Sequence, residues 1–356
     1  MKKLYSFLIG IIAIILVLWG WSRHIESRTK RGFGDKLVIY NWGDYIDPEL
    51  LTKFTKETGI QVQYETFDSN ESMYTKIKQG GTTYDIAIPS EYMISKMMSE
   101  RLLEKLDHSQ IKGLENIGKR FLNQSFDPKN QYSIPYFWGT LGIVYNTELV
   151  KTVPKHWSDL WRPEYKNSIM MIDGAREVMG IGLNALGYSL NSKNPKQLQE
   201  AVNKLYRLTP NIKAIVADEM KGYMIQNNAA IGVSFSGEAR QMLAKNDKLR
   251  YIVPTEASNL WFDNIVIPKT VKNKKAAYQF INFMLKPENA YKNALYVGYS
   301  TPNVPAKAML PKEVQEDKAF YPDEKTLKHL EVYQQLGAKW LGVYNDLYLQ
   351  MKMYRK

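Results

Sequence analysis

The sequence predicts an α/β protein of two lobes, joined by two or more chain crossings and enclosing a ligand cleft. Strand and helix patterns alternate through residues 36–89, which is typical of parallel strands with helical crossovers. Two later apolar segments, residues 136–145 and 261–268, have the strand character expected of chains that pass between lobes. A chain of 356 residues is also long enough to bury two cores.

The N-terminus predicts a membrane signal. After Lys2 and Lys3, residues 4–22 carry no charge and approach the roughly 20 apolar residues that span a bilayer. No small-residue cleavage site or lipid-attachment cysteine follows. We therefore interpret residues 1–22 as an uncleaved signal-anchor, with a processed signal peptide as the alternative. Residues 23–35 are polar and are expected to link it to an extracytoplasmic domain.

Residues 36–89 predict the first strands and helices. Asp47 and Pro48 are typical of a helix start, and Gly59 is typical of a helix end. Because ligands of parallel sheets bind beyond the carboxyl ends of the strands, the segments after the first and third strands should share one edge. The expected strands cover residues 36–41, 60–64 and 84–89, and the second helix covers residues 71–79.

The rest of the chain predicts a second set of elements and the lobe boundaries. Strands are expected over residues 169–172, 229–235 and 251–254, an amphipathic helix over 275–291, and largely helical structure over 322–356. We expect lobe 1 to contain residues 36–139 and 264–310, and lobe 2 to contain residues 140–263 and 311–356.

Composition argues against several classes of function. The chain has no cysteine, and no two of its four histidines have the spacing of metal ligands. Residues 1–34 carry +5 of its net charge of +12, and the remaining +7 comes from dispersed lysines and arginines without a recognisable nucleic-acid motif. We therefore expect no metal, no cofactor and no nucleic-acid partner, and a monomer is the default expectation.

Aromatic residues stand beside acids in segments that are expected at strand-to-loop junctions. An ammonium gains about 0.5–2 kcal/mol from an aromatic face, and a carboxylate about 4 Å away adds on the order of 4 kcal/mol before desolvation. The pattern therefore favours a pocket for a thin, multiply charged organic cation. The segments are Trp42-Gly43-Asp44-Tyr45, Ser90-Glu91-Tyr92, Asp173-Gly174-Ala175-Arg176-Glu177 and Trp261-Phe262-Asp263.

Structural explanations compete with a binding role at each position. Asp44 could cap a turn, and Glu177 is stabilised by a helix dipole whether or not a ligand exists. Tyr92 and Tyr299 could be packing residues. Asp263 is harder to explain structurally, because a carboxylate in an apolar strand requires a partner.

Enzymatic signatures fail, so no catalytic residue is expected. Residues 180–187 lack the spacing of a dinucleotide loop, and residues 232–237 do not complete a nucleophile elbow. Paired carboxylates leave a glycoside hydrolase open as an alternative. A surface adhesin, or the same fold binding an amino acid, iron or an anion, also remain alternatives.

Several motifs together resemble the spermidine/putrescine-binding proteins of bacterial polyamine ABC importers. The motifs are residues 40–45, 67–71, 84–90, 173–177, 261–263 and 298–303. The resemblance implies a two-lobed periplasmic-binding-protein fold of the type II kind. It also implies polyamine capture outside the cytoplasm and delivery to a membrane permease driven by a separate ATPase. The N-terminal anchor would hold the protein at the outer face of the membrane.

The resemblance also assigns roles to residues of this chain. Glu177 and Asp263 would pair with the ammonium groups of the polyamine, and Asp44 and Ser90 would contact one terminal amine. The aromatic walls of the site would be formed by Trp42, Tyr45, Tyr92, Trp261 and Tyr299. The family often has an acid where Gly174 stands here, so Asp173 is a candidate substitute. Phe235 stands in place of a family tryptophan, and Tyr333 falls at the position of a family glutamine.

Overall fold

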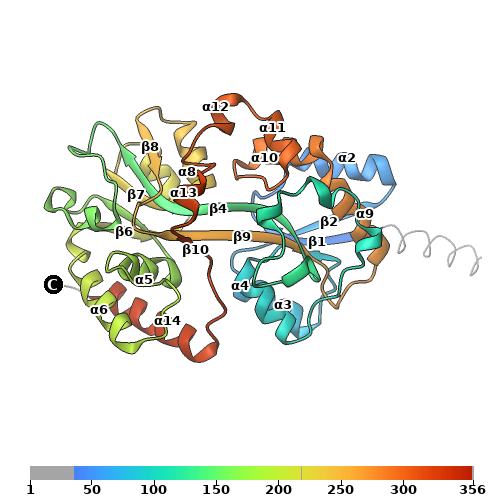
Figure 1. Cartoon of the computed structure of the whole chain (residues 1–356), viewed down its shortest axis with the longest axis horizontal. Helices are drawn as coiled ribbons and strands as arrows, with labels where there is room; N and C mark the ends of the chain where they lie inside the picture. Colours follow the sequence, from blue (N-terminus) through green and yellow to red (C-terminus); the bar gives the residue numbers. More distant parts are fainter. Residues whose placement is uncertain (1–35, 218, 355–356) are drawn as a thin grey trace, which may run out of the picture.

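The computed structural model describes residues 36–217 and 219–354. The predicted anchor, residues 1–22, and the predicted linker, residues 23–35, lie outside the described residues. In the described part of the chain, no helix combines the length and apolar character needed to cross a bilayer. The chain forms two α/β lobes joined by two long strands (Figure 1), which confirms the predicted fold class.

The first lobe is built on three parallel strands. Strand β1 pairs with β2 on one side and with β3 on the other. Asp47 accepts the backbone N–H of Glu49, and Gly59 closes the same helix with a left-handed φ of 76°, as the sequence predicts. The elements are β1 (Lys36–Trp42), α2 (Pro48–Thr58), β2 (Gln61–Phe67), α3 (Asn70–Gln79), β3 (Ile86–Ala87) and α4 (Glu91–Ser99).

Two antiparallel strands cross between the lobes. Strand β4 (Ser133–Asn146) pairs with β9 (Ser258–Val266) along residues 133–140, and then pairs with second-lobe strands along residues 141–146. Every residue of β4 is buried, as expected for a strand with protein on both faces. The crossing segments predicted at residues 136–145 and 261–268 lie almost entirely in these two strands.

The second lobe continues the sheet beyond β4. Its strand order is β4-β7-β5-β6, and β8 pairs with β4 separately. The helices α5, α6 and α14 pack together beside this sheet. The elements are β5 (Ile169–Ile172), α5 (Ala175–Asn184), α6 (Pro195–Tyr206), β6 (Ile212–Val216), α7 (Glu219–Ile225), β7 (Ile231–Phe235), α8 (Ser236–Leu243) and β8 (Leu249–Ile252).

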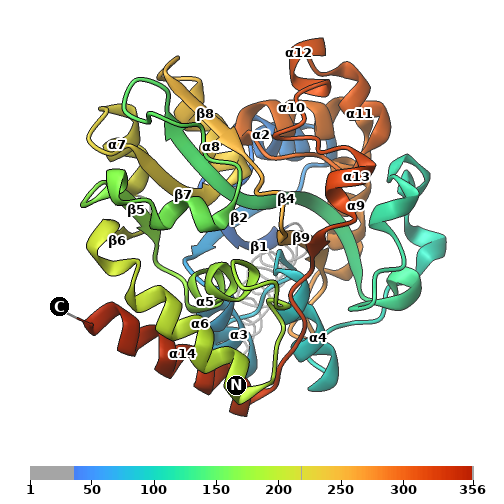
Figure 2. The same ribbon diagram turned by 60° about the vertical axis from the view of Figure 1, so that its left-hand side comes forward.

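The C-terminal segment passes from one lobe to the other. Phe320 and Leu327 pack in the core of the first lobe, whereas Leu336 and Tyr344 pack in the core of the second. Between them, β10 pairs with β9, and the chain then runs down to α14 (Figure 2). The elements are α9 (Lys274–Leu285), α10 (Pro287–Val297), α11 (Val304–Met309), α12 (Lys312–Gln315), α13 (Glu324–Leu327), β10 (Leu330–Glu331) and α14 (Ala338–Met353).

One predicted helix was wrong, and a segment predicted to be largely helical is interrupted. The single helix expected over residues 275–291 is two helices, because Pro287 cannot continue α9 and holds Lys286 in an extended conformation with ψ 130°. The segment 322–356 contains β10 and non-helical chain between α13 and α14. The apolar pattern continues across the first break because α9 and α10 bury side chains in the same core. It continues across the second because α13 and α14 each bury side chains, although in the cores of different lobes.

Candidate functional site

Asp263 lies at the centre of the candidate site. The residue is 5% exposed and lies on a strand that runs between the lobes. The hydroxyl of Tyr45 donates to one carboxylate oxygen at 2.6 Å, and the hydroxyl of Ser90 donates to the other at 2.7 Å. Burial raises the pKa of Asp263 to about 6, although both hydrogen bonds oppose the shift. The carboxylate is therefore mostly ionised at pH 7.

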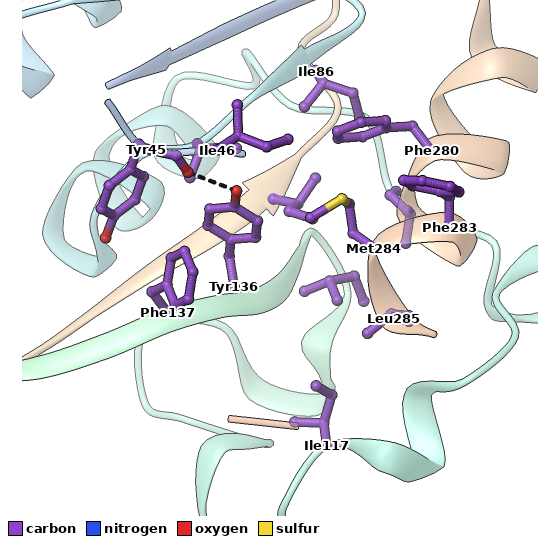
Figure 3. Close-up of a cluster of buried hydrophobic side chains, with 14 of the residues drawn as sticks. Tyr45, Ile46, Ile86, Ile117, Tyr136, Phe137, Phe280, Phe283, Met284 and Leu285 are labelled. Carbon is purple, nitrogen blue, oxygen red and sulfur yellow. Dashed lines mark hydrogen bonds between the residues drawn. The ribbon is translucent and has the colours of Figure 1, made fainter. Parts of the chain in front are cut away.

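The strand ends place the two donors around this carboxylate. Tyr45 follows β1, and Tyr136 donates a 2.8 Å hydrogen bond to its backbone carbonyl, as the dashed line in Figure 3 shows. Ser90 follows β3 and caps α4, and its backbone forms an isolated bridge with Asp263. The shared sheet edge expected from the sequence therefore brings both residues to Asp263.

Asn70 extends this network and was missed from the sequence. Its buried amide donates to the hydroxyls of Ser90 and Tyr92, each at 3.0 Å, and its oxygen accepts the Ser90 backbone N–H. The Tyr92 hydroxyl in turn donates to Glu71 at 3.3 Å. Both Asn70 and Glu71 lie in the motif 67–71, but an amide and an acid in a helix first turn look like ordinary end residues.

Aromatic rings form a wall beside Asp263. The Tyr299 ring lies 5.4 Å from the Tyr45 ring and 5.0 Å from the Trp261 ring, and Phe235 lies 6.1 Å from Trp261, all measured between centroids. A Cβ atom at Gly237 would lie 2.1 Å from the Tyr299 ring. Glycine there is therefore required for this ring position.

Trp42 is the last residue of β1, and Asp44 lies in the turn that follows it. The Trp42 ring packs 4.5 Å from the Phe67 ring, and its buried indole N–H has no hydrogen-bond partner within the described residues. Asp44 is exposed and has a left-handed φ of 49°. Trp42 is therefore positioned by the β1–β2 pairing, and Asp44 by the turn that leads to Tyr45. Their contacts with a ligand remain predictions.

Glu177 brings an acid from the second lobe to the first. It lies in the first turn of α5, and burial raises its pKa, against opposing effects from its backbone N–H, Arg176 and Tyr333. The Arg176 guanidinium stacks 4.3 Å from the Tyr333 ring centroid, and that ring lies 6.5 Å from the Tyr92 ring. Tyr92 and Glu177 also interact electrostatically, so the two lobes meet here.

Asp173 points to a different partner. Tyr348 and Lys352 on α14 both donate to its carboxylate, Lys352 at 2.7 Å. Although burial opposes it, these contacts lower the pKa of Asp173. The acid that the sequence offers as a substitute for the family contact is therefore engaged in an ion pair with the C-terminal helix.

Glu91 is a second acid whose importance the sequence did not reveal. It is fully buried, and one oxygen accepts the Phe262 backbone N–H at 2.9 Å. The other oxygen has no hydrogen-bond partner among residues 36–217 and 219–354. Burial raises the pKa of Glu91 to about 8. The Glu91 carboxyl, which is mainly neutral, thus binds β9 at Phe262, the residue next to the ionised Asp263.

The assembled groups suit a cation held between lobes. Carboxylates from β9 and α5 lie beside tyrosine and tryptophan rings, whose faces attract ammonium groups. Within the described residues, no group of three or more acids and histidines has the geometry of a metal site. The arrangement offers recognition by charge and ring faces.

The chain has two α/β lobes that are joined by long strands, and aromatic rings and carboxylates lie where the lobes meet. Together with the family match, this identifies the class as an extracytoplasmic solute-binding protein rather than an enzyme. Relatives support this class along nearly the whole chain. The spermidine/putrescine-binding periplasmic protein of Salmonella typhimurium is 38% identical over 344 residues, covering 93% of this chain and 98% of the relative. The chain belongs to the bacterial extracellular solute-binding proteins, whose family profile matches residues 49–322.

Further relatives agree in sequence and in structure. The spermidine/putrescine-binding periplasmic protein 1 of Haemophilus influenzae is 37% identical, covering 93% of this chain and 92% of the relative. A crystal structure is known for the spermidine/putrescine ABC transporter substrate-binding protein PotD from Streptococcus pneumoniae, whose sequence is 77% identical to this chain. It superimposes with a TM-score of 0.84, covering 90% of this chain and 100% of that chain.

Proposed function

We propose that this protein captures spermidine or putrescine between its lobes and delivers it to the permease of an ABC importer that has a separate ATPase. The observation that carries the proposal is the setting of Asp263, a buried and largely ionised carboxylate beside three aromatic rings. The relatives described above, which are named as spermidine/putrescine-binding proteins, support the same ligand class. A buried carboxylate of this kind gains a cationic partner when a polyamine ammonium binds.

The geometry suggests how the ligand closes the lobes. Asp263 and Ser90 hold one ammonium on the first-lobe side, while Glu177 holds another from α5. Glu177 and Glu71 of α3 repel each other across the lobes until a cation lies between them. A polyamine therefore favours the closed state, because it binds that state more tightly than the open one.

The remaining predicted residues complete the proposed ligand shell. Asp44 receives a terminal amine, and Tyr333 closes the second-lobe side of the site. The carbon chain of the polyamine is lined by the rings of Trp42, Tyr45, Tyr92, Phe235, Trp261 and Tyr299. Asp173 acts instead by fixing α14 through Lys352. The protein works as a monomer held at the outer membrane face by residues 1–22. Its lobes follow the boundaries given for the sequence except within residues 311–356, where Phe320 and Leu327 pack in the first-lobe core.

Thermal shift and calorimetry test this function. Spermidine and putrescine should each raise the midpoint of thermal unfolding, whereas sugars, phosphate and neutral amino acids should not. Calorimetry then gives the affinity for each polyamine. A shift with phosphate or a sugar but not with polyamines would point to another solute, and no shift with any compound would favour an adhesin.

A further inference from the structure

Gly174 lies directly under the carboxylate of Glu177. A Cβ atom built at Gly174 would lie 2.1 Å from Oε2 of Glu177 and 2.9 Å from its Cδ, both far inside van der Waals contact. The Glu177 side chain therefore folds back over the residue that precedes α5. No side chain can occupy position 174 while Glu177 keeps this conformation.

The backbone at Gly174 does not itself require glycine. Its φ of −155° and ψ of 123° are extended values that any residue adopts. The need for glycine thus comes from the Glu177 carboxylate and not from backbone strain. An added methyl group would displace the far end of a flexible side chain, so the fold would tolerate the change while the carboxylate moved.

The neighbouring acid cannot take over. Asp173 is held by Lys352 at 2.7 Å and by the Tyr348 hydroxyl, on the helix that packs against α5. Of the two acids in residues 173–177, Glu177 is the one that interacts with Glu71 and with the Tyr333 hydroxyl near the facing lobe. The position of the second-lobe carboxylate thus depends on the rotamer of one side chain, that of Glu177.

We propose that Gly174 is a positioning residue, whose missing side chain lets the Glu177 carboxylate fold back to the place from which it binds one polyamine ammonium. This inference rests on the proposed function. It assigns the placement of the second-lobe charge, and hence the discrimination between polyamines of different nitrogen spacing, to a residue that carries no functional group.

Substitution Gly174→Ala in the full-length protein tests the inference by calorimetry with spermidine and putrescine. The affinity for spermidine should fall at least fivefold and the ratio of the two affinities should change, while the unfolding midpoint without ligand stays within about 2 °C. Gly222→Ala is the matched control, because a Cβ at Gly222 meets nothing within 4 Å. That variant should bind as the unchanged protein does.

The Glu177→Ala background separates positioning from other effects. With the long side chain removed, a methyl group at position 174 has nothing to displace, so adding Gly174→Ala should weaken binding no further. A carboxyl-carbon NMR titration without ligand gives a second readout. In Gly174→Ala the raised pKa of Glu177 should fall toward its ordinary value as the carboxylate moves into water.

The outcomes distinguish the inference from the proposed function. If the unchanged protein binds no polyamine, the proposed function fails. If it binds spermidine and Gly174→Ala binds equally well, or the NMR titration of Glu177 is the same in both proteins, the positioning role is overturned and the function stands. An equal loss in the Glu177→Ala background would also overturn it.

Discussion

Replacing Asp263 by asparagine removes the charge at the centre of the proposed site while keeping the shape. An ammonium about 4 Å from a carboxylate gains roughly 4 kcal/mol at an effective dielectric near 20, before desolvation is subtracted. Neighbouring acids and the asparagine oxygen recover part of that gain. We expect spermidine to bind at least tenfold more weakly to Asp263→Asn, measured by calorimetry at pH 7.

The pH dependence of binding sharpens this test. With a pKa of about 6, Asp263 is mostly ionised at pH 7 and mostly protonated at pH 5. Because the cation needs the ionised form, protonation should weaken binding about tenfold between these pH values. Other acids titrate in both proteins, so the difference between the profiles of the unchanged protein and Asp263→Asn isolates this one carboxyl.

Asp173→Asn is the matched control, since it neutralises an acid that the structure ties to Lys352 on α14. It should bind spermidine with unchanged affinity. The reasoning is refuted if a folded Asp263→Asn binds as tightly as the unchanged protein at pH 7, or if the two proteins share one pH profile.

Three further predictions concern the surroundings of the site. Glu91→Gln should flatten the pH dependence of stability. Because the pKa of Glu91 is raised to about 8 in the folded protein, this residue makes stability fall as pH rises from its unfolded pKa toward 8. Melting curves of both proteins at pH 5 and pH 8 measure the difference. Gly237→Ala should push the Tyr299 ring aside and weaken spermidine binding several-fold in calorimetry, whereas equal affinity would exclude that ring from the wall. Lys352→Ala should lower the free energy of unfolding by less than about 1 kcal/mol in urea titrations, because the ion pair is partly exposed.

The centre of the site could be predicted from the sequence because its chemistry is local. An acid in an apolar strand has to find a partner, and Asp263 finds two hydroxyls. Ser90 and Tyr45 follow parallel strands, whose carboxyl ends share an edge by topology alone. These arguments need only the order of strands and the identity of the residues that follow them.

The rest depends on long-range packing that no local pattern encodes. Asp173 and Lys352 of α14 are 179 residues apart in the sequence, so their ion pair is visible only in three dimensions. The role of Asn70 depends on the rotation of α3 about its own axis. The helix break at Pro287 was readable from the residue itself, but the continuing apolar pattern of 275–291 outweighed it in the interpretation.

Glu91 and Asp263 are two buried acids at the same strand, β9, and they have different roles. Glu91 binds the backbone N–H of Phe262, whereas the next residue along β9 presents its own carboxylate to the hydroxyls of the site. With pKa values of about 8 and about 6, the first acid is mainly neutral and the second mainly ionised at pH 7. If both were charged, their repulsion would add to the cost of burial. The neutral acid therefore supports β9 while leaving the negative charge at Asp263, where a cation can reach it.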